Sequence, residues 1–244
     1  MIRIATWNVE RPRLSERTRR LRLLNTMKSM QADVWILTET HTSLSPGRSF
    51  TAVTTEKLDC CHEPGETWVT IWSRLPIERL AKTSDPARAL AVRIVQETAR
   101  PLVLYGTVLP WLGSAWQNVP SANGAAFSAA LSVQLSDWLT FQRDNPDCDF
   151  VLAGDFNRDV ALSHYYGSRQ NRAALRGAIT TAKLQCLTAA NLDPVPKHAP
   201  ACASIDHICV SAGLTLVDSP VSWPTSEEPL KTLSDHFGVL VELA

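Results

Sequence analysis

The sequence predicts an α/β fold, a layered α/β sandwich of mixed β-sheets covered by helices. Many short apolar runs of strand length are interleaved with only a few helical patterns. Some of the strand-like runs follow each other as hairpin pairs, which a strictly alternating parallel fold does not contain. The chain has 244 residues, of which 45% are hydrophobic. That length permits one sizeable core, so residues 1–244 are expected to form a single domain.

The first half of the chain is expected to be rich in strands. One helix is predicted where Leu21, Leu24 and Met27 recur at helical spacing, with arginines at other positions of the segment. A Pro-Gly turn at residues 64–65 separates two runs that have a strand pattern. The expected elements are helix 14–30 and strands 2–8, 33–38, 50–55, 67–73, 89–96 and 101–109.

The second half is expected to contain two helices and the remaining strands. The first of these helices should end near Asn145, because the residue before a proline disfavours the helical conformation. A strand before Gly154 is apolar and leads directly into polar residues. The expected elements are helices 122–143 and 169–184 and strands 149–153, 204–210, 214–218 and 237–243.

Charge and cysteine content narrow the class of protein. Lys plus Arg and Asp plus Glu each number 24, so the net charge is zero and avid non-specific binding to nucleic acid is not favoured. No apolar run is long enough to span a membrane, and the opening residues have a strand pattern rather than that of a secretory leader. The six cysteines include no CxxC pair, which argues against a zinc framework. We expect free thiols in a reducing, cytoplasmic setting.

Polar residues recur where the predicted strands end, and the ends of neighbouring strands in layered α/β folds converge on one rim. Carboxylates at such a rim suit Mg²⁺ or Mn²⁺, which prefer hard oxygen ligands. A histidine beside an aspartate suits proton transfer, because the carboxylate fixes the tautomer of the imidazole. Each residue alone is more often a turn residue, a cap or a surface carboxylate, so the prediction depends on their joint occurrence. The set is Asn8, Glu10, Glu39, Asp155, Asn157, Asp206, His207, Asp235 and His236.

These residues lie in five segments that resemble motifs of the endonuclease/exonuclease/phosphatase superfamily. The segments are IATWNVE, WILTET, VLAGDFN, SIDHICV and SDHFGV, and they extend from residue 4 to residue 239. GDFN is one of the most specific, as is SDH together with the upstream IDH. The resemblance implies two mixed β-sheets packed face to face with helices outside. It also implies a divalent-metal-dependent enzyme that hydrolyses phosphate esters.

The resemblance further implies a role for each matching residue. Asp155 is expected to position or deprotonate the attacking water, and Asn157 to form a hydrogen bond to the phosphate. Asp206 is expected to orient His236. Whether Asp155 or His236 takes the proton from water is left open. The implied metal-site residues are Asn8, Glu10, Glu39 and Asp235, and the implied catalytic residues are Asp155, Asn157, Asp206 and His236.

Val108 departs from the family pattern. Many members place His or Tyr at this position, where the side chain contacts the phosphate, and valine cannot donate a hydrogen bond. Loss of one such donor typically costs on the order of 100-fold or more in rate. Either a neighbour such as Tyr105, Trp111 or Trp116 makes the substrate contact instead, or the enzyme is slower or differently selective.

Further substrate contacts are expected in two loops near these motifs. Arg11 and Arg13 follow the first motif and can meet a phosphate backbone, with a solvated helix face as an equal alternative. Trp111 and Trp116 can stack on a base or sugar, with core packing as the alternative. The segment 165–172, which follows GDFNRD, lies where loops of the family meet substrate.

Three functions are consistent with this sequence. The leading one is a phosphodiesterase dependent on Mg²⁺ or Mn²⁺, with DNA or RNA as substrate. The second is a phosphatase or phosphodiesterase acting on a phospholipid headgroup or sugar phosphate, and the zero net charge mildly supports it. The third is a non-catalytic binding module on the same fold. Val108 suggests it, but the retained acidic residues argue against it.

Overall fold

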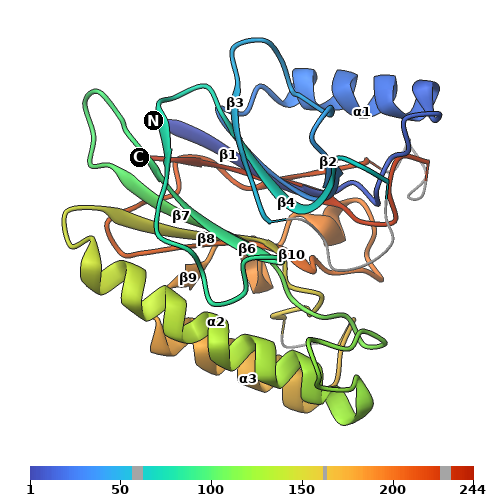
Figure 1. Cartoon of the computed structure of the whole chain (residues 1–244), viewed down its shortest axis with the longest axis vertical. Coiled ribbons are helices and arrows are strands. Elements are labelled where there is room, and N and C mark those ends of the chain that lie inside the picture. Colours follow the sequence, from blue (N-terminus) through green and yellow to red (C-terminus); the bar gives the residue numbers. More distant parts are fainter. Residues whose placement is uncertain (57–62, 162–163, 226–231) are drawn as a thin grey trace.

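Two mixed β-sheets stack face to face in the computed structural model, with helices on both outer faces (Figure 1). The structure describes residues 1–56, 63–161, 164–225 and 232–244. Within those ranges, the strands form two sheets of six strands each. Strands run both parallel and antiparallel in each sheet. The predicted layered sandwich is therefore confirmed.

The first sheet contains both terminal strands of the chain. Strand β1 pairs in parallel with β2 and antiparallel with β12, so the two terminal strands lie side by side. Helix α1 (Arg17–Met30) connects β1 to β2 and covers the outer face of this sheet (Figure 1). In spatial order the strands are β11 (Val221–Trp223), β12 (Gly238–Leu243), β1 (Ile2–Asn8), β2 (Val34–His41), β4 (Glu66–Ser73) and β3 (Thr51–Thr54).

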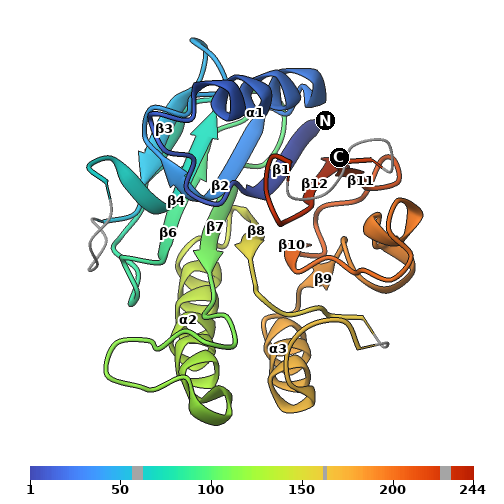
Figure 2. The same cartoon turned by 90° about the vertical axis from the view of Figure 1, so that its right-hand side faces the viewer.

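The second sheet has a parallel pair at its centre, β7 with β8. Helix α2 (Ala125–Asp144) connects these two strands after a short 3₁₀ turn, and α3 (Arg169–Thr181) follows β8. Figure 2 shows α2 and α3 next to each other below this sheet. In spatial order the strands are β5 (Ile77–Arg79), β6 (Ala89–Ile94), β7 (Leu102–Val108), β8 (Asp149–Asp155), β10 (Asp206–Val210) and β9 (Gln185–Cys186).

Strand alternation divides the apolar residues among three layers of core. Along β7, Leu102 and Leu104 face the other sheet, whereas Val103 and Tyr105 face α2 and α3. On the other side of the molecule, Leu23 and Met27 of α1 pack on the outer face of the first sheet. Each sheet is thus buried on both faces, which explains why the strands read as nearly continuous apolar runs. No helix in the described ranges is long and apolar enough to cross a bilayer.

Three predicted boundaries are corrected. The strand predicted over 214–218 is reduced to an isolated antiparallel bridge between Leu216 and Leu243, flanked by backbone hydrogen bonds of Thr215 with Ala244 and of Val217 with Glu242. Helix 14–30 begins later, at Arg17, after a turn in which the Glu16 side chain accepts from the backbone of Arg13. Helix 169–184 ends at Thr181, because Lys183 adopts a left-handed backbone conformation that an α-helix cannot continue.

Two strands reach further than expected, and both carry residues of the predicted site. Strand β2 continues to His41 and so includes Glu39, and β8 continues to Asp155. The two carboxylates therefore belong to paired strands rather than to loops, which holds them more rigidly. The described cysteines are free thiols, as predicted, while Cys60 and Cys61 lie outside the described residues.

Gly154 marks the closest approach between β8 and its neighbour β7. Its φ is +141°, and a Cβ there would lie 2.0 Å from the carbonyl oxygen of Thr107. Gly154→Ala is therefore expected to lower the free energy of unfolding by about 3 kcal/mol or more, through overpacking and backbone strain. Urea unfolding monitored by tryptophan fluorescence measures this loss.

Gly177 supplies a matched control for that substitution. It lies inside α3, and a Cβ at this position meets nothing within 4 Å. Gly177→Ala is expected to raise the free energy of unfolding by about 0.5–1 kcal/mol, because alanine favours the helix. Similar stabilities for the two variants would contradict the assignment of Gly154 as a steric requirement.

Candidate active site

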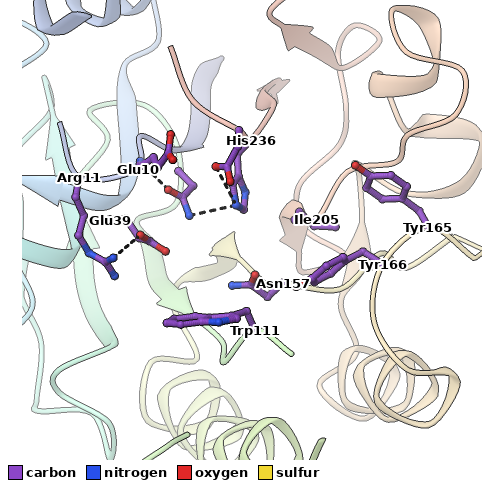
Figure 3. Close-up of a pocket in the computed structure, with 11 residues that line it drawn as sticks. Glu10, Arg11, Glu39, Trp111, Asn157, Tyr165, Tyr166, Ile205 and His236 are labelled. Atoms are coloured by element: carbon purple, nitrogen blue, oxygen red, sulfur yellow. Dashed lines mark hydrogen bonds and ion pairs between the residues drawn. The ribbon is translucent and has the colours of Figure 1, made fainter. Parts of the chain in front are cut away.

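The polar residues from the strand ends converge on one cavity of about 460 Å³ at the edge of the sandwich. It lies where β1, β2 and β8 end and where β10 begins. Figure 3 shows the labelled side chains arranged around this space, with Arg11 at one side and Tyr165 at the other. The cavity is lined by Asn8, Glu10, Arg11, Glu39, Trp111, Asn157, Tyr165, Tyr166, Ile205, Asp235 and His236.

Asp155 is fully buried behind the residues that line the cavity, and its carboxylate is fixed by three donors. The backbone N–H of Asn157 donates to Oδ1 at 2.8 Å. The side-chain amides of Asn157 and Asn8 donate to Oδ2 at 2.7 and 3.0 Å. Asn157 adopts a φ of +49°, which turns the chain back so that both of its nitrogens face the same carboxylate. The orientation of Asp155 is therefore set by its neighbours.

The pKa of Asp155 is raised to about 7. Burial is the largest cause, and the charges of Asp206 and Glu39 add to it, while His236 and the Asn157 N–H favour the anion. A carboxylate whose pKa lies near neutrality is a better proton acceptor than an ordinary aspartate, because proton transfer is most efficient when the pKa matches the working pH.

His236 is held by a short contact with Asp206. Its Nδ1 lies 2.6 Å from Oδ2 of Asp206, which is itself buried. Burial opposes a charge on the imidazole, but the carboxylates of Asp206, Asp155 and Asp235 outweigh it and raise the pKa of His236 to about 10. The imidazole therefore carries a positive charge at neutral pH and can donate through Nε2 toward the cavity.

The backbone around His236 is held from two directions. Ser234 Oγ accepts from the N–H of His236 at 3.1 Å and donates to the carbonyl oxygen of Asn8 at 2.6 Å. Trp7 Nε1 donates to the carbonyl oxygen of His236 at 3.1 Å. Sequence reasoning gave Ser234 no role, although it stands in the SDH segment. Its hydroxyl ties the loop before β12 to the end of β1.

Asp155, Asp206 and His236 present ligand atoms that all lie within 4.8 Å of one another. Oδ1 of Asp206 is buried and has no hydrogen-bond partner in the part of the chain that the structure describes. An unpaired buried carboxylate oxygen is costly unless a donor or cation meets it. The three groups thus surround a point that suits a water molecule or a cation.

Acidic groups gather on the other side of the cavity. Glu39, with a φ of +45°, places Oε2 3.0 Å from Nη1 of Arg11. Burial and the charges of Asp235 and Glu39 raise the pKa of Glu10, against the influence of Arg19. These carboxylates repel one another, and the carbonyl oxygen of the Asn8 side chain lies beside them, accepting from the backbone of Glu10. A hard divalent cation fits this donor set and would relieve the repulsion.

Two of the predicted substrate residues lie elsewhere. The substrate contact predicted for Tyr105 is wrong, because strand alternation turns this side chain away from the cavity. Tyr105 is fully buried against α2, where its hydroxyl donates to Asp137 Oδ2 at 3.0 Å. Trp116 is only 6% exposed and donates through Nε1 to Asp85 Oδ2 at 2.7 Å. It lines a neighbouring cavity instead of the one described here.

The remaining predicted residues are divided between the cavity and the surface. Trp111 is 38% exposed and lines the cavity, as does Arg11. Arg13 is exposed on a turn outside the cavity lining, where its backbone N–H donates to Glu16. His207, on the face of β10 opposite to that of Asp206, is buried, with Nε2 3.1 Å from the carbonyl oxygen of Arg158.

Val108 is buried between the sheets and pairs in register with Asp155. Of the three neighbours considered as replacements for the missing donor, Trp111 is the one that lines the cavity. The position of Tyr105 and the bond from Trp116 to Asp85 remove both of these side chains from that role.

Tyr105→Phe is therefore expected to leave kcat of the enzyme within about 2-fold, while lowering the free energy of unfolding by about 1 kcal/mol. The loss of stability is small because Asp137 keeps two donors, the backbone N–H and the hydroxyl of Ser84. Steady-state kinetics and urea unfolding measure the two effects. A fall in kcat of ten times or more with unchanged stability would place Tyr105 back in the reaction.

Comparisons with known proteins identify a family and a shared fold. The sequence profile of the Endonuclease/Exonuclease/phosphatase family matches residues 5–236. No curated protein sequence matches the chain. Among solved structures, an endonuclease/exonuclease/phosphatase from Beutenbergia cavernae superposes with a TM-score of 0.65 at 18% identity, covering 99% of this chain and 71% of that one.

Two further structures share the fold over most of their length. A mannosyl-6-phosphatase from Bacteroides thetaiotaomicron has a TM-score of 0.66 at 15% identity, with 100% of both chains covered. The AP endonuclease of Leishmania major has a TM-score of 0.66 at 17% identity, with 98% of this chain and 86% of that one covered. At such identities the likeness shows the fold alone.

Proposed function

The chain belongs to the endonuclease/exonuclease/phosphatase family, and on that premise we propose that it is a divalent-metal-dependent phosphodiesterase whose leading substrate is DNA or RNA. The observation that supports the proposal is the convergence of Asp155, Asp206 and His236 within 4.8 Å, where His236 lines the cavity and the two aspartates are buried behind it. A proton acceptor and a positively charged donor thus face the same point. Attack of water on a phosphate ester requires both.

Asp155 is the residue that takes the proton from water. Its raised pKa lies near neutrality, and its carboxylate is oriented by Asn8 and Asn157. His236 is already protonated, so it cannot accept that proton. The general base, open on the sequence alone, is therefore assigned to Asp155.

His236 acts on the phosphate. The imidazolium donates through Nε2, while Asp206 holds Nδ1 and stabilises the charge. Both N–H groups of the Asn157 side chain already donate, to Oδ2 of Asp155 at 2.7 Å and to the carbonyl oxygen of Leu109 at 3.0 Å, so a hydrogen bond from Asn157 to the phosphate requires one of these bonds to break. Donors fixed before the reaction stabilise the oxyanion without the cost of reorganising.

Glu39 and the side-chain oxygen of Asn8 would hold the metal, with Glu10 and Asp235 beside them. When bound, the ion neutralises charge on the phosphate and stabilises the oxyanion that develops. His236 is less suited to bind it, because the proton on a positively charged imidazole occupies the lone pair that a metal needs. Mg²⁺ and Mn²⁺ match these oxygen ligands.

A sugar phosphate or a phospholipid headgroup is the second candidate substrate. The net charge of zero favours it, because the overall field does not attract a polyanion. The two candidates differ in salt dependence. A nucleic acid backbone makes KM rise steeply with salt, whereas a small monoester responds weakly.

The test uses the purified chain with bis-p-nitrophenyl phosphate, p-nitrophenyl phosphate, DNA, RNA and a sugar phosphate, each with Mg²⁺ or Mn²⁺. Asp155→Ala and His236→Ala are assayed in parallel. We expect metal-dependent hydrolysis by the parent chain and a loss of at least about 100-fold in both variants. Equal rates for the parent and both variants would reject the proposal.

A further inference from the structure

A second cavity, of about 440 Å³, adjoins the catalytic one on the side of Arg11. Arg11 and Trp111 line both cavities and so join them. Within the second cavity the guanidinium carbons of Arg11 and Arg88 lie 4.3 and 4.5 Å from the centroid of the Trp68 ring. Trp111 is tilted beside Trp68, with centroids 6.2 Å apart. We call this the tryptophan subsite.

A third cavity, of about 920 Å³, adjoins the catalytic one on the opposite side. Tyr165 and Tyr166 line both of these cavities. The third cavity also contains Arg169, Arg172 and Arg176, which succeed one another along α3, and no acidic side chain of the described residues lines it. Asp159 pairs with Arg172, so the charges directed at the cavity are those of Arg169 and Arg176. We call this the tyrosine subsite.

The two subsites lie on opposite sides of the reacting groups. In Figure 3, Arg11 and Glu39 lie on one side of His236 and Asn157, and Tyr165 and Tyr166 lie on the other. Both subsites have volumes within the range that holds an organic ligand of nucleotide size. A terminal phosphate monoester that reaches the catalytic cavity would leave at least one of them unused.

An exposed aromatic ring stands at each junction. Trp111 and Tyr165 are each 38% exposed, whereas most aromatic side chains of this molecule are buried in its core. A ring open to solvent on one face can stack on a nucleobase, and stacking tolerates any base. Arg88 beside Trp111, and Arg169 and Arg176 beside Tyr165, supply positive charge for the phosphates that flank the scissile one, whereas the charge of Arg11 is paired with Glu39. Each subsite thus combines the two features that bind one segment of a nucleic acid strand.

From this arrangement we propose that the chain cleaves internal phosphodiester linkages of single-stranded nucleic acid. The proposal rests on the phosphodiesterase function above. The strand crosses the catalytic cavity with one neighbouring base on Trp111 and another on Tyr165. In a duplex the bases are already stacked and paired, so neither ring reaches a base face without unpairing. The strand passes on at both sides, so no free end is needed.

Circular single-stranded DNA, which has no ends, tests this directly. It is compared with a linear strand of the same sequence and with the linear duplex, in Mg²⁺ or Mn²⁺, and bis-p-nitrophenyl phosphate reports the chemistry alone. We expect the circle to be cut within about 3-fold of the rate of the linear strand, and the duplex at least about 10-fold more slowly. Cleavage of linear strands but not of circles, or equal cleavage of duplex, overturns the inference.

Substitutions in each subsite test its role in binding the nucleic acid strand. Trp111→Ala and Tyr165→Ala are each expected to raise KM for the oligonucleotide about 10-fold more than KM for bis-p-nitrophenyl phosphate. Arg169→Gln combined with Arg176→Gln should raise the oligonucleotide KM and flatten its dependence on salt. The control combines Arg100→Gln with Arg143→Gln, an exposed arginine before β7 and another in the last turn of α2, and should leave the oligonucleotide KM and its salt dependence unchanged.

The experiments distinguish failure of this inference from failure of the phosphodiesterase function on which it rests. Metal-dependent hydrolysis of bis-p-nitrophenyl phosphate without cleavage of any DNA or RNA strand would keep the phosphodiesterase and reject the two subsites. No hydrolysis of any ester would reject the phosphodiesterase, and this inference with it. Equal effects of each subsite variant on both substrates would also reject the subsites, because small substrates do not reach them.

Discussion

Asp155→Asn is expected to lower kcat for phosphodiester hydrolysis by about 1,000-fold or more. The substitution keeps the shape of the side chain but removes the proton acceptor, which alone is worth about 100 to 10,000-fold. The substitution also replaces one carboxylate oxygen with an amide N–H₂ group, which then faces hydrogen-bond donors. Oδ1 and Oδ2 of Asp155 both accept hydrogen bonds, from Asn157 and Asn8, and an asparagine cannot satisfy all of these donors. Hydrolysis of bis-p-nitrophenyl phosphate at saturating metal measures the effect.

Asp149→Asn is the matched control, since Asp149 begins the strand that Asp155 ends. It is also buried, at 8% exposure, and its carboxylate lies near the hydroxyl of Ser211 at the other end of the sheet. We expect kcat within about 2-fold of the parent value, because this carboxylate lies outside the cavity. Retention of more than a tenth of kcat by Asp155→Asn, with Asp149→Asn unaffected, would remove Asp155 from the reaction.

The layered fold followed from strand-length apolar runs, because burial on both faces of each sheet leaves a signal that survives in a single sequence. The prediction of a full strand over residues 214–218 was not correct. The segment makes a single bridge from Leu216 to Leu243, and local composition does not distinguish a single bridge from a longer ladder. The short strands β5, β9 and β11 are two or three residues long and leave too little pattern to detect.

The site was predictable to the extent that it lies on strands. The motifs implied that Asp155 and Val108 lie at the same end of their sheet, and the two residues do pair in register. The error at Tyr105 was avoidable. Residues three apart in a strand face opposite sides, so Tyr105 and Val108 cannot share a face. Trp111 and Trp116 stand in a loop, where no periodicity indicates which ring faces the cavity.

The ion pair of Arg11 with Glu39 could not be predicted from spacing. It depends on left-handed backbone conformations at Glu10, Arg11 and Glu39, none of which is a glycine or asparagine. Such conformations are rare for these residue types and are held by the surrounding fold. Here the backbone N–H of Arg11 donates to the carbonyl oxygen of Glu39 at 2.7 Å, which ties the segment after β1 to β2.

Glu39→Gln is expected to raise the metal concentration that gives half-maximal activity by about 10-fold or more. The substitution removes the one carboxylate on β2 that faces the cavity and leaves its size unchanged. It weakens attraction for a divalent cation while Asn8 and Asp235 remain in place. Chelation of metal from the parent chain should abolish hydrolysis. Direct binding of Mn²⁺, followed by the electron paramagnetic resonance signal of the free ion, measures affinity without activity.

Glu242→Gln controls for the loss of an arginine partner, since Glu242 pairs with Arg3 at 3.1 Å as Glu39 pairs with Arg11 at 3.0 Å. Both substitutions break one glutamate–arginine pair, but Glu242 lies on β12 outside the cavity. We expect Mn²⁺ affinity to fall in Glu39→Gln and to stay at the parent value in Glu242→Gln. Unchanged Mn²⁺ affinity together with a lower kcat in Glu39→Gln would mean that Glu39 acts by holding Arg11 and not by binding the metal.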